Sequence, residues 1–340
     1  MDLDSKLDRL EQAFRPLLEL IDEGLALDGV PVGQRQIRAA RELVDEFIPS
    51  IRFGDNEQRA PGAFTEYSSE PWFKAIFGHV EKWYQNRYGL RLNTPTINVM
   101  RGVTLIASTP FEFHVPVTAS EVEVEFETAW LSFPPTVLPG EDIYSWIINP
   151  PSWDSYSEDE KTRTTSTMQE IASLLRRISC HKTGAKISDP LVRNLLAGVR
   201  VHLHSAAYLI SKEDEEGGFA RAQWELQMAC ESAYKGYLQQ KNGVFPETHD
   251  LFTIHDLSQL PESSVKRQWL KDIPRWNEAV NLRYGIGDHP TVTGIFFWYK
   301  QTLRIISGIF ENLEGINLTE ARLLLKMTPW LDPPLDKKVD

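Results

Sequence analysis

The stretch from Gly218 to Leu238 constrains the fold of this chain most, because its pattern predicts a helix that is apolar on two sides. One stripe consists of Ala222, Leu226, Ala229, Ala233 and Tyr237, and the other of Ala220, Trp224, Met228 and Tyr234. A helix with one apolar stripe lies on a surface, whereas a helix with two is surrounded by neighbours. The small alanines allow those neighbours to approach closely. The sequence therefore predicts that this helix lies in the middle of a helical bundle.

Helical patterns on both sides supply the neighbours of this central helix. They cover Leu191–Leu209, about Ser264–Arg283, and Pro290–Leu313. The last of them has a stripe that we expect to face Ala229 and Ala233, formed by Val292, Ile295, Tyr299, Leu303, Ile306 and Phe310. Short connections between consecutive helices favour an up-and-down arrangement. We therefore expect residues 188–315 to form an antiparallel four-helix bundle.

The first 155 residues show a different pattern. Helical periodicity in 4–27, 33–47 and 71–88 is followed by alternation of apolar and polar residues. In Glu121–Glu127 the apolar Val122, Val124 and Phe126 alternate with four glutamates, which is typical of a strand with one buried and one solvated face. Residues 1–155 are therefore expected to be an α+β region with a small antiparallel sheet.

Two segments lie outside these regions. Ser157-Glu-Asp-Glu160 has the spacing of a capping box and opens a helix that we expect to link the two regions over 156–187. Residues 316–340 are expected to form a short helix at Thr319–Lys326 and a tail rich in proline and charge. A length of 340 residues also favours two units over one. The predicted fold class of the whole chain is α+β.

The net charge of −12 argues against a surface built mainly for phosphate backbones, although it leaves room for a local basic site. Two cysteines are too few for a disulfide framework or a cysteine-rich zinc site and fit a reduced, cytoplasmic setting. The N-terminus has no basic segment followed by an apolar run, so no signal peptide is expected. No apolar stretch approaches the roughly 18–20 residues that span a bilayer, so no membrane association is expected.

Three elements of the bundle carry a resemblance to a known family. The first is Gly218–Leu238, which has an alanine-rich face and a glutamate followed four residues later by a lysine. The second is the loop after it, Thr248-His249-Asp250-Leu251. The third is the end of the next predicted helix, Ala279-Val-Asn-Leu-Arg-Tyr-Gly285. In this order and spacing, residues 188–315 resemble the HEPN family (higher eukaryotes and prokaryotes nucleotide-binding). The resemblance implies a helical bundle that commonly pairs, so a homodimer is expected. It also implies a nucleotide, an RNA or a protein partner as ligand.

Catalytic members of that family cleave RNA without metal, using an arginine and a histidine with four to six residues between them. Five residues separate Arg283 from His289 here. A histidine can move the proton of a ribose hydroxyl, and a guanidinium can hold the phosphate. Tyr284 matches the non-catalytic members instead, in which arginine is followed by tyrosine. An arginine in a last helical turn, with a glycine two residues later, is also what helix capping alone selects.

Four further residues have two interpretations each. The resemblance would direct His249 and Asp250 at a ligand, whereas the simpler interpretation is that Asp250 caps a short helix beginning at Leu251. Glu231 and Lys235 stand four apart on the central helix and form either an exposed pair or part of a polar ligand site. His202 and His204 point apart on a helix, so we expect no metal, and no cofactor motif is present.

Two function hypotheses follow. The first is a HEPN-like module that binds a nucleotide, an RNA or a protein partner without catalysis of its own, with Lys235, Glu231, His249, Asp250 and Tyr284 as candidate ligand-binding residues. The alternative is a metal-independent endoribonuclease, a toxin or defence effector, that uses Arg283 and His289. The tyrosine after Arg283 and the acidic charge favour the first.

Overall fold

A computed structural model describes residues 3–52, 58–89, 99–124, 128–212, 217–284 and 290–326. The chain divides into two compact units. One comprises Met1–Ile97, Glu123–Ala129 and Lys326–Asp340, and the other comprises Asn98–Val122 and Trp130–Leu325. Helices with small antiparallel sheets confirm the predicted α+β class.

The N-terminal unit is helical, with α1 (Leu3–Leu27), α2 (Val32–Phe47), α3 (Phe64–Tyr67) and α4 (Pro71–Tyr88). The three helices predicted from periodicity are confirmed. Their apolar faces meet in a core whose described side chains include Leu18, Leu43 and Phe73. Asp22 is buried beside this core, and Arg35 and the hydroxyl of Tyr88 both donate hydrogen bonds to its carboxylate.

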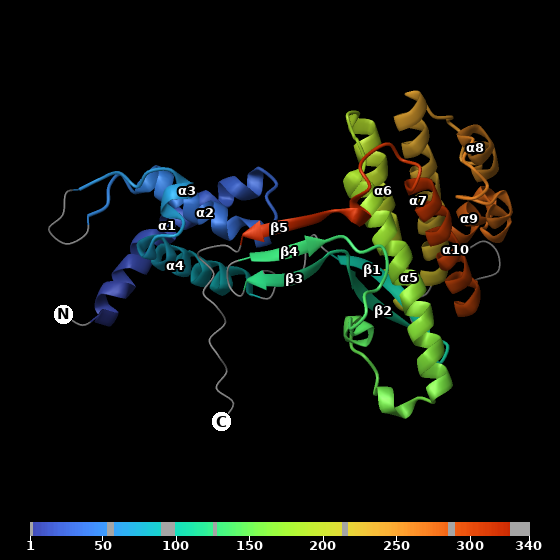
Figure 1. Ribbon diagram of the computed structural model, residues 1–340, viewed down its shortest axis with the longest axis horizontal. Coiled ribbons are helices and arrows are strands. Elements are labelled where there is room, and N and C mark those ends of the chain that lie inside the picture. The colour runs from blue at the N-terminus through green and yellow to red at the C-terminus, as the bar shows by residue number, and fades with distance from the viewer. Residues whose placement is uncertain are drawn as a thin grey trace. The chain divides into compact units, whose positions relative to one another are not determined.

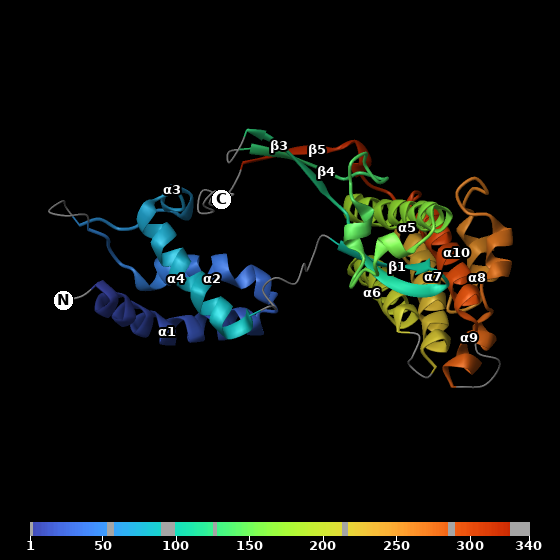
Figure 2. The same ribbon diagram turned by 90° about the horizontal axis from the view of Figure 1, so that it is seen from below.

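The first sheet is a hairpin of β1 (Val99–Ile106) and β2 (Thr109–Pro116). Its two-residue turn consists of Ala107 and Ser108, which both have positive φ, as the right-handed twist of a hairpin demands. The hairpin packs against α5 (Glu158–Gly184) and α6 (Pro190–Ser211) (Figure 2). It therefore belongs to the core of the second unit, which contains α5 to α10 and which we call the helical unit.

The second sheet has the strand order β3 (Ala119–Val124), β4 (Thr128–Ser132) and β5 (Arg322–Lys326). The strand expected around Glu121 is thus present as far as the structure describes it. The predicted helix at Thr319–Lys326 is wrong, because Leu318–Glu320 is a 3₁₀ turn and Arg322–Lys326 pairs with β4. Five residues rich in leucine form only one turn of helix, so strand pairing outweighs their helix propensity.

The bundle consists of α5, α6, α7 (Gly218–Asn242) and α10 (Val292–Phe310) (Figure 1). The helix expected to link two regions is therefore one of the four bundle helices, because the face with Met168, Ile171 and Leu175 is buried. The capping box of Ser157 and Glu160 opens it as predicted.

The predicted helix over Ser264–Arg283 is wrong. The segment forms a 3₁₀ helix at Arg267–Asp272, here called η4, and a short α9 at Trp276–Arg283. Pro274 separates the two, because proline disfavours helical backbone at the residue before it. With α8 (Leu251–Ser258), α9 packs against α7 on one side of the bundle (Figure 1).

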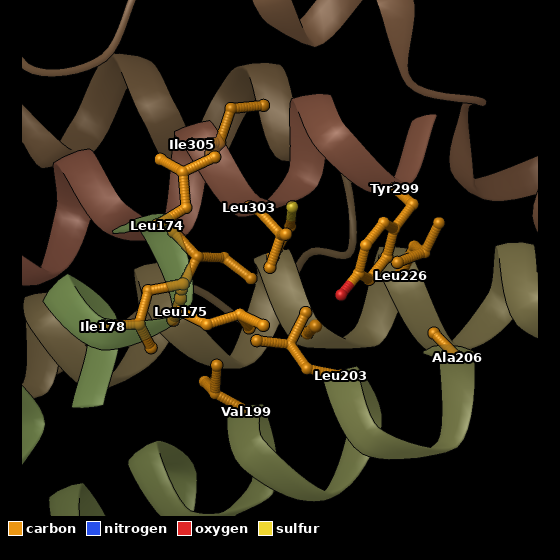
Figure 3. Packing of buried hydrophobic residues seen from close by; sticks show 14 of the residues in the cluster. Leu174, Leu175, Ile178, Val199, Leu203, Ala206, Leu226, Tyr299, Leu303 and Ile305 are labelled. Carbon is orange, nitrogen blue, oxygen red and sulfur yellow. The ribbon is translucent and has the colours of Figure 1, made fainter. Parts of the chain in front are cut away.

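The core of the bundle lies where α5, α6, α7 and α10 meet. Figure 3 shows Leu175 and Ile178 facing Leu203 of α6, with Leu303 and Tyr299 above them. Ala229 and Ala233 are fully buried on α7, which packs against both α6 and α10. Their predicted burial is confirmed. Of the consecutive aromatic residues on α10, Phe296 is buried and Phe297 is exposed, and the homodimer stays a prediction.

Candidate functional site

The central helix α7 carries a row of buried polar side chains where an interior helix is expected to be apolar. Gln223, Gln227, Glu231 and Lys235 follow one another at four-residue spacing, which places them on one face. Burying such groups costs free energy unless hydrogen bonds compensate for it.

Glu231 is the centre of this row, and only 4% of its surface is exposed. One carboxylate oxygen forms an ion pair with the ammonium of Lys235 at 2.9 Å. Both oxygens lie 3.0 Å from Nδ1 of His249, which donates to them when it carries the proton. The sequence interpretation of an exposed helix pair is therefore wrong, because Glu231 and Lys235 are buried and His249 joins them.

His249 is held from two further directions. Its carbonyl oxygen accepts a hydrogen bond from Nε2 of Gln227 at 3.4 Å. Its ring is stacked on the indole of Trp276, with ring centroids 4.0 Å apart and an angle of 8° between the planes. Trp276 in turn lies 5.0 Å from Trp224 of α7. We call Trp224, Trp276 and His249 the aromatic row.

Asp250, the next residue, begins α8. Its carboxylate accepts a hydrogen bond from the backbone N–H of Thr253 at 3.1 Å and another from the Thr253 hydroxyl. The hydrogen bonds from Thr253 hold the pKa of Asp250 below its usual value. The simpler interpretation of the sequence, in which Asp250 caps the following helix, describes this geometry.

Asp250 also lines a cavity of about 660 Å³ beside α8, η4 and α9, which we call the cationic cleft. The other lining residues are Phe252, Arg267, Leu270, Lys271, Ile273, Arg275 and Glu278. Leu270 and Ile273 are buried and Phe252 is half-buried, so the floor of the cleft is apolar. The rim is charged, with three cations and two carboxylates.

The three cations of the rim are not equivalent. Arg267 forms a bidentate ion pair with Asp256, at 2.8 and 3.1 Å, and its guanidinium lies over the ring of Phe252. Lys271 and Arg275 are exposed and have no ion-pair partner among the residues that the structure describes. These two positive charges are therefore available to a ligand.

Of the remaining predicted site residues, the structure describes the side chain of Tyr284. Tyr284 follows α9 and is 73% exposed. The side chain of Arg283 and the whole of His289 lie outside the described residues, so their proposed pairing stays untested.

Sequence reasoning missed Lys271, Arg275 and Trp276. A signal was present, because residues 266–275 hold four basic side chains and one acidic one in a chain whose net charge is −12. Such a local excess of positive charge is the usual footprint of an anion site.

Metal ligation finds no support in the part of the chain that the structure describes, where no three histidine, cysteine, aspartate or glutamate side chains form a cluster able to hold an ion. None of the described helices has the length and apolar character needed to cross a bilayer. Comparisons with protein-family models, with curated proteins and with solved structures find no match for this chain. The resemblance to the HEPN family therefore stays a prediction.

Proposed function

We propose that the helical unit is a binding module, without catalysis of its own, that holds a nucleotide in the cationic cleft. The observation that carries this proposal is the position of Lys271 and Arg275, which have no ion-pair partner among the described residues, on the rim of a cleft with an apolar floor. A nucleotide has the complementary chemistry, because it joins a flat apolar base to charged phosphates.

Each part of the cleft suits one part of such a ligand. The guanidinium of Arg275 can bind two phosphate oxygens at once, and Lys271 adds a second positive charge. The half-buried ring of Phe252 offers an apolar surface for the base, above the buried Leu270 and Ile273. The carboxylate of Glu278 can accept hydrogen bonds from ribose hydroxyls. A volume of about 660 Å³ is in the range of small-molecule sites.

The side chains that line the cleft support binding rather than catalysis. None of them is a histidine, cysteine, serine or threonine. A general base works best when its pKa lies near the working pH. The hydrogen bonds from Thr253 hold the pKa of Asp250 low and occupy its carboxylate, so Asp250 is a poor proton acceptor.

Titration calorimetry of the full chain with ATP, AMP and inorganic phosphate tests the proposal. We expect ATP to bind more tightly than AMP, and AMP more tightly than phosphate, because each addition uses more of the cleft. Lys271→Ala and Arg275→Ala should each weaken ATP binding about tenfold, since a charge-assisted hydrogen bond contributes roughly 1.5 kcal/mol or more.

Arg193→Ala is the matched control, because Arg193 is exposed on α6 and its loss changes the net charge equally. This variant should bind ATP as the parent protein does. Absence of nucleotide binding, or equal weakening by Arg193→Ala, would overturn the proposal.

A further inference from the structure

A second cavity, of about 560 Å³, lies between α6 and α7, and we call it the α6–α7 groove. Its lining residues are Ser205, Tyr208, Leu209, Arg221, Trp224 and Glu225. It combines two aromatic rings with one guanidinium and one carboxylate, and the Glu225 carboxylate is already bound by His202 at 2.7 Å.

Two cations lie at this groove, near its aromatic residues. The ammonium of Lys212 lies 5.8 Å from the ring centroid of Tyr208, and the exposed Arg221 stands in the first turn of α7. Neither Lys212 nor Arg221 has an ion-pair partner within the described ranges. The groove therefore repeats the chemistry of the cationic cleft, with apolar surface beside cations that form no ion pair with a described residue.

The aromatic row connects the two cavities. Trp224 lines the α6–α7 groove and contacts Trp276, which is stacked on His249. At the other end, His249 and Trp276 are the chain neighbours of Asp250 and Arg275, which line the cationic cleft. A continuous line of aromatic rings thus has cations near both of its ends, Lys271 and Arg275 at one and Lys212 and Arg221 at the other, and none of the four forms an ion pair with a described residue.

From this juxtaposition we infer that the helical unit binds single-stranded nucleic acid along a path from the cationic cleft, across the aromatic row, to the α6–α7 groove. The inference rests on the proposed function and extends it from one nucleotide to several. Proteins that bind single strands combine cations that follow the phosphates with aromatic rings on which bases stack. A single strand leaves its base faces accessible, whereas a duplex stacks them internally.

Oligonucleotide length gives the sharpest test. Fluorescence anisotropy of labelled oligothymidylates and oligouridylates of two to ten nucleotides, with the full chain, should show affinity rising at least tenfold once the probe spans both cavities. The two series distinguish DNA from RNA. Affinity that does not depend on length would overturn the inference.

Arg221→Ala separates this inference from the proposed function. The variant should weaken binding of the ten-nucleotide probe about fivefold or more and leave ATP binding unchanged. Lys271→Ala should weaken both ligands, and Arg193→Ala neither. Arg221→Ala should also lower the slope of log affinity against log salt by about 0.7, the value for one lost contact to a single strand. An unchanged slope and affinity would contradict the path.

The failures are distinguishable. If ATP binds as proposed and probe length or Arg221→Ala has no effect, only the extended path is wrong. If neither ATP nor any oligonucleotide binds, the proposed function fails as well. A duplex or a poly-glutamate peptide that competes as well as the single strand would also overturn the inference, because charge alone would then explain binding.

Discussion

The carboxylate of Glu231 lies 2.9 Å from the ammonium of Lys235, and this ion pair is buried on the central helix of the bundle. Glu231→Gln would leave the Lys235 charge in the interior without its partner. Removing one member of a buried pair costs roughly 3–5 kcal/mol. We expect a loss of about 3 kcal/mol in the free energy of unfolding, measured by urea denaturation.

Glu158→Gln is the control for this change. Glu158 pairs with Lys161 at 2.8 Å on α5, but the Glu158 side chain is 87% exposed. Exposed pairs contribute about 0–1 kcal/mol, so this variant should unfold almost as the parent does. Equal losses for both variants would show that Glu231 has no special role in the interior.

Two helical glycines test the packing of the bundle. A Cβ on Gly308 of α10 would lie 2.1 Å from the carbonyl oxygen of Ser264, whereas one on Gly198 of α6 would meet only the Ser232 hydroxyl, at 3.8 Å. Gly308→Ala should therefore destabilise the protein by about 3 kcal/mol, because it overpacks a close contact with backbone.

Gly198→Ala should have the opposite effect and stabilise the protein by about 0.5–1 kcal/mol, since alanine favours the helix. Thermal unfolding of the two variants measures both changes. A harmless Gly308→Ala substitution would contradict the close approach of Ser264 to α10.

The sequence predicts the central part of the bundle but not its full set of helices. The two apolar stripes of α7 predict its place in the middle of the bundle. Ala229 belongs to one stripe and Ala220 to the other, and both are buried, as expected for a helix with neighbours on both sides. The role of α5 was missed, because an amphipathic helix does not reveal which partner covers it. Arg322–Lys326 was misread because its strand partner, β4, lies about 190 residues earlier in the chain.

The candidate site shows the same limit. Glu231 and Lys235 stand on one helix, so their proximity follows from spacing alone. Glu231 also contacts His249, and His249 stacks on Trp276. Both contacts depend on how the segments 243–250 and 273–276 fold back onto α7. That path is set by tertiary packing, which residue spacing does not encode.

Stability should fall in acid because of His204. This side chain accepts a hydrogen bond from the backbone N–H of Arg101 at 3.2 Å, which requires a neutral Nε2. Burial lowers the pKa of His204 to about 4, the charges of Arg200, Arg101 and His114 act in the same direction, and Glu112 opposes them.

In the unfolded chain the pKa of a histidine is about 6.5, so between pH 6.5 and 4 the unfolded state binds a proton that the folded state does not. The stability present above pH 6.5 is lost as the pH falls through this range, by about 3 kcal/mol at most. Urea denaturation measures the free energy of unfolding at pH 7 and at pH 4.5. The difference between these two values should be smaller for His204→Gln than for the parent. Identical differences would rule out this contribution.

RNA should stay intact in the presence of the purified protein. We expect mixed RNA, incubated with the full chain and a chelator, to show no cleavage, because the side chains that line the cationic cleft include no base matched to neutral pH. Gel electrophoresis checks this. Chelator-resistant cleavage that disappears in both Arg283→Ala and His289→Ala would instead support the endoribonuclease hypothesis.

Photolabelling with 8-azido-ATP tests the central proposal most directly, because it reports where a nucleotide binds. After irradiation and tryptic digestion, mass spectrometry should find the label in peptides from 242–283, which contain Phe252 and the residues next to Arg275. Excess ATP should prevent labelling, and Arg275→Ala should reduce it about tenfold. Label found only in the N-terminal unit, or label that excess ATP does not displace, would contradict a nucleotide site in the cationic cleft.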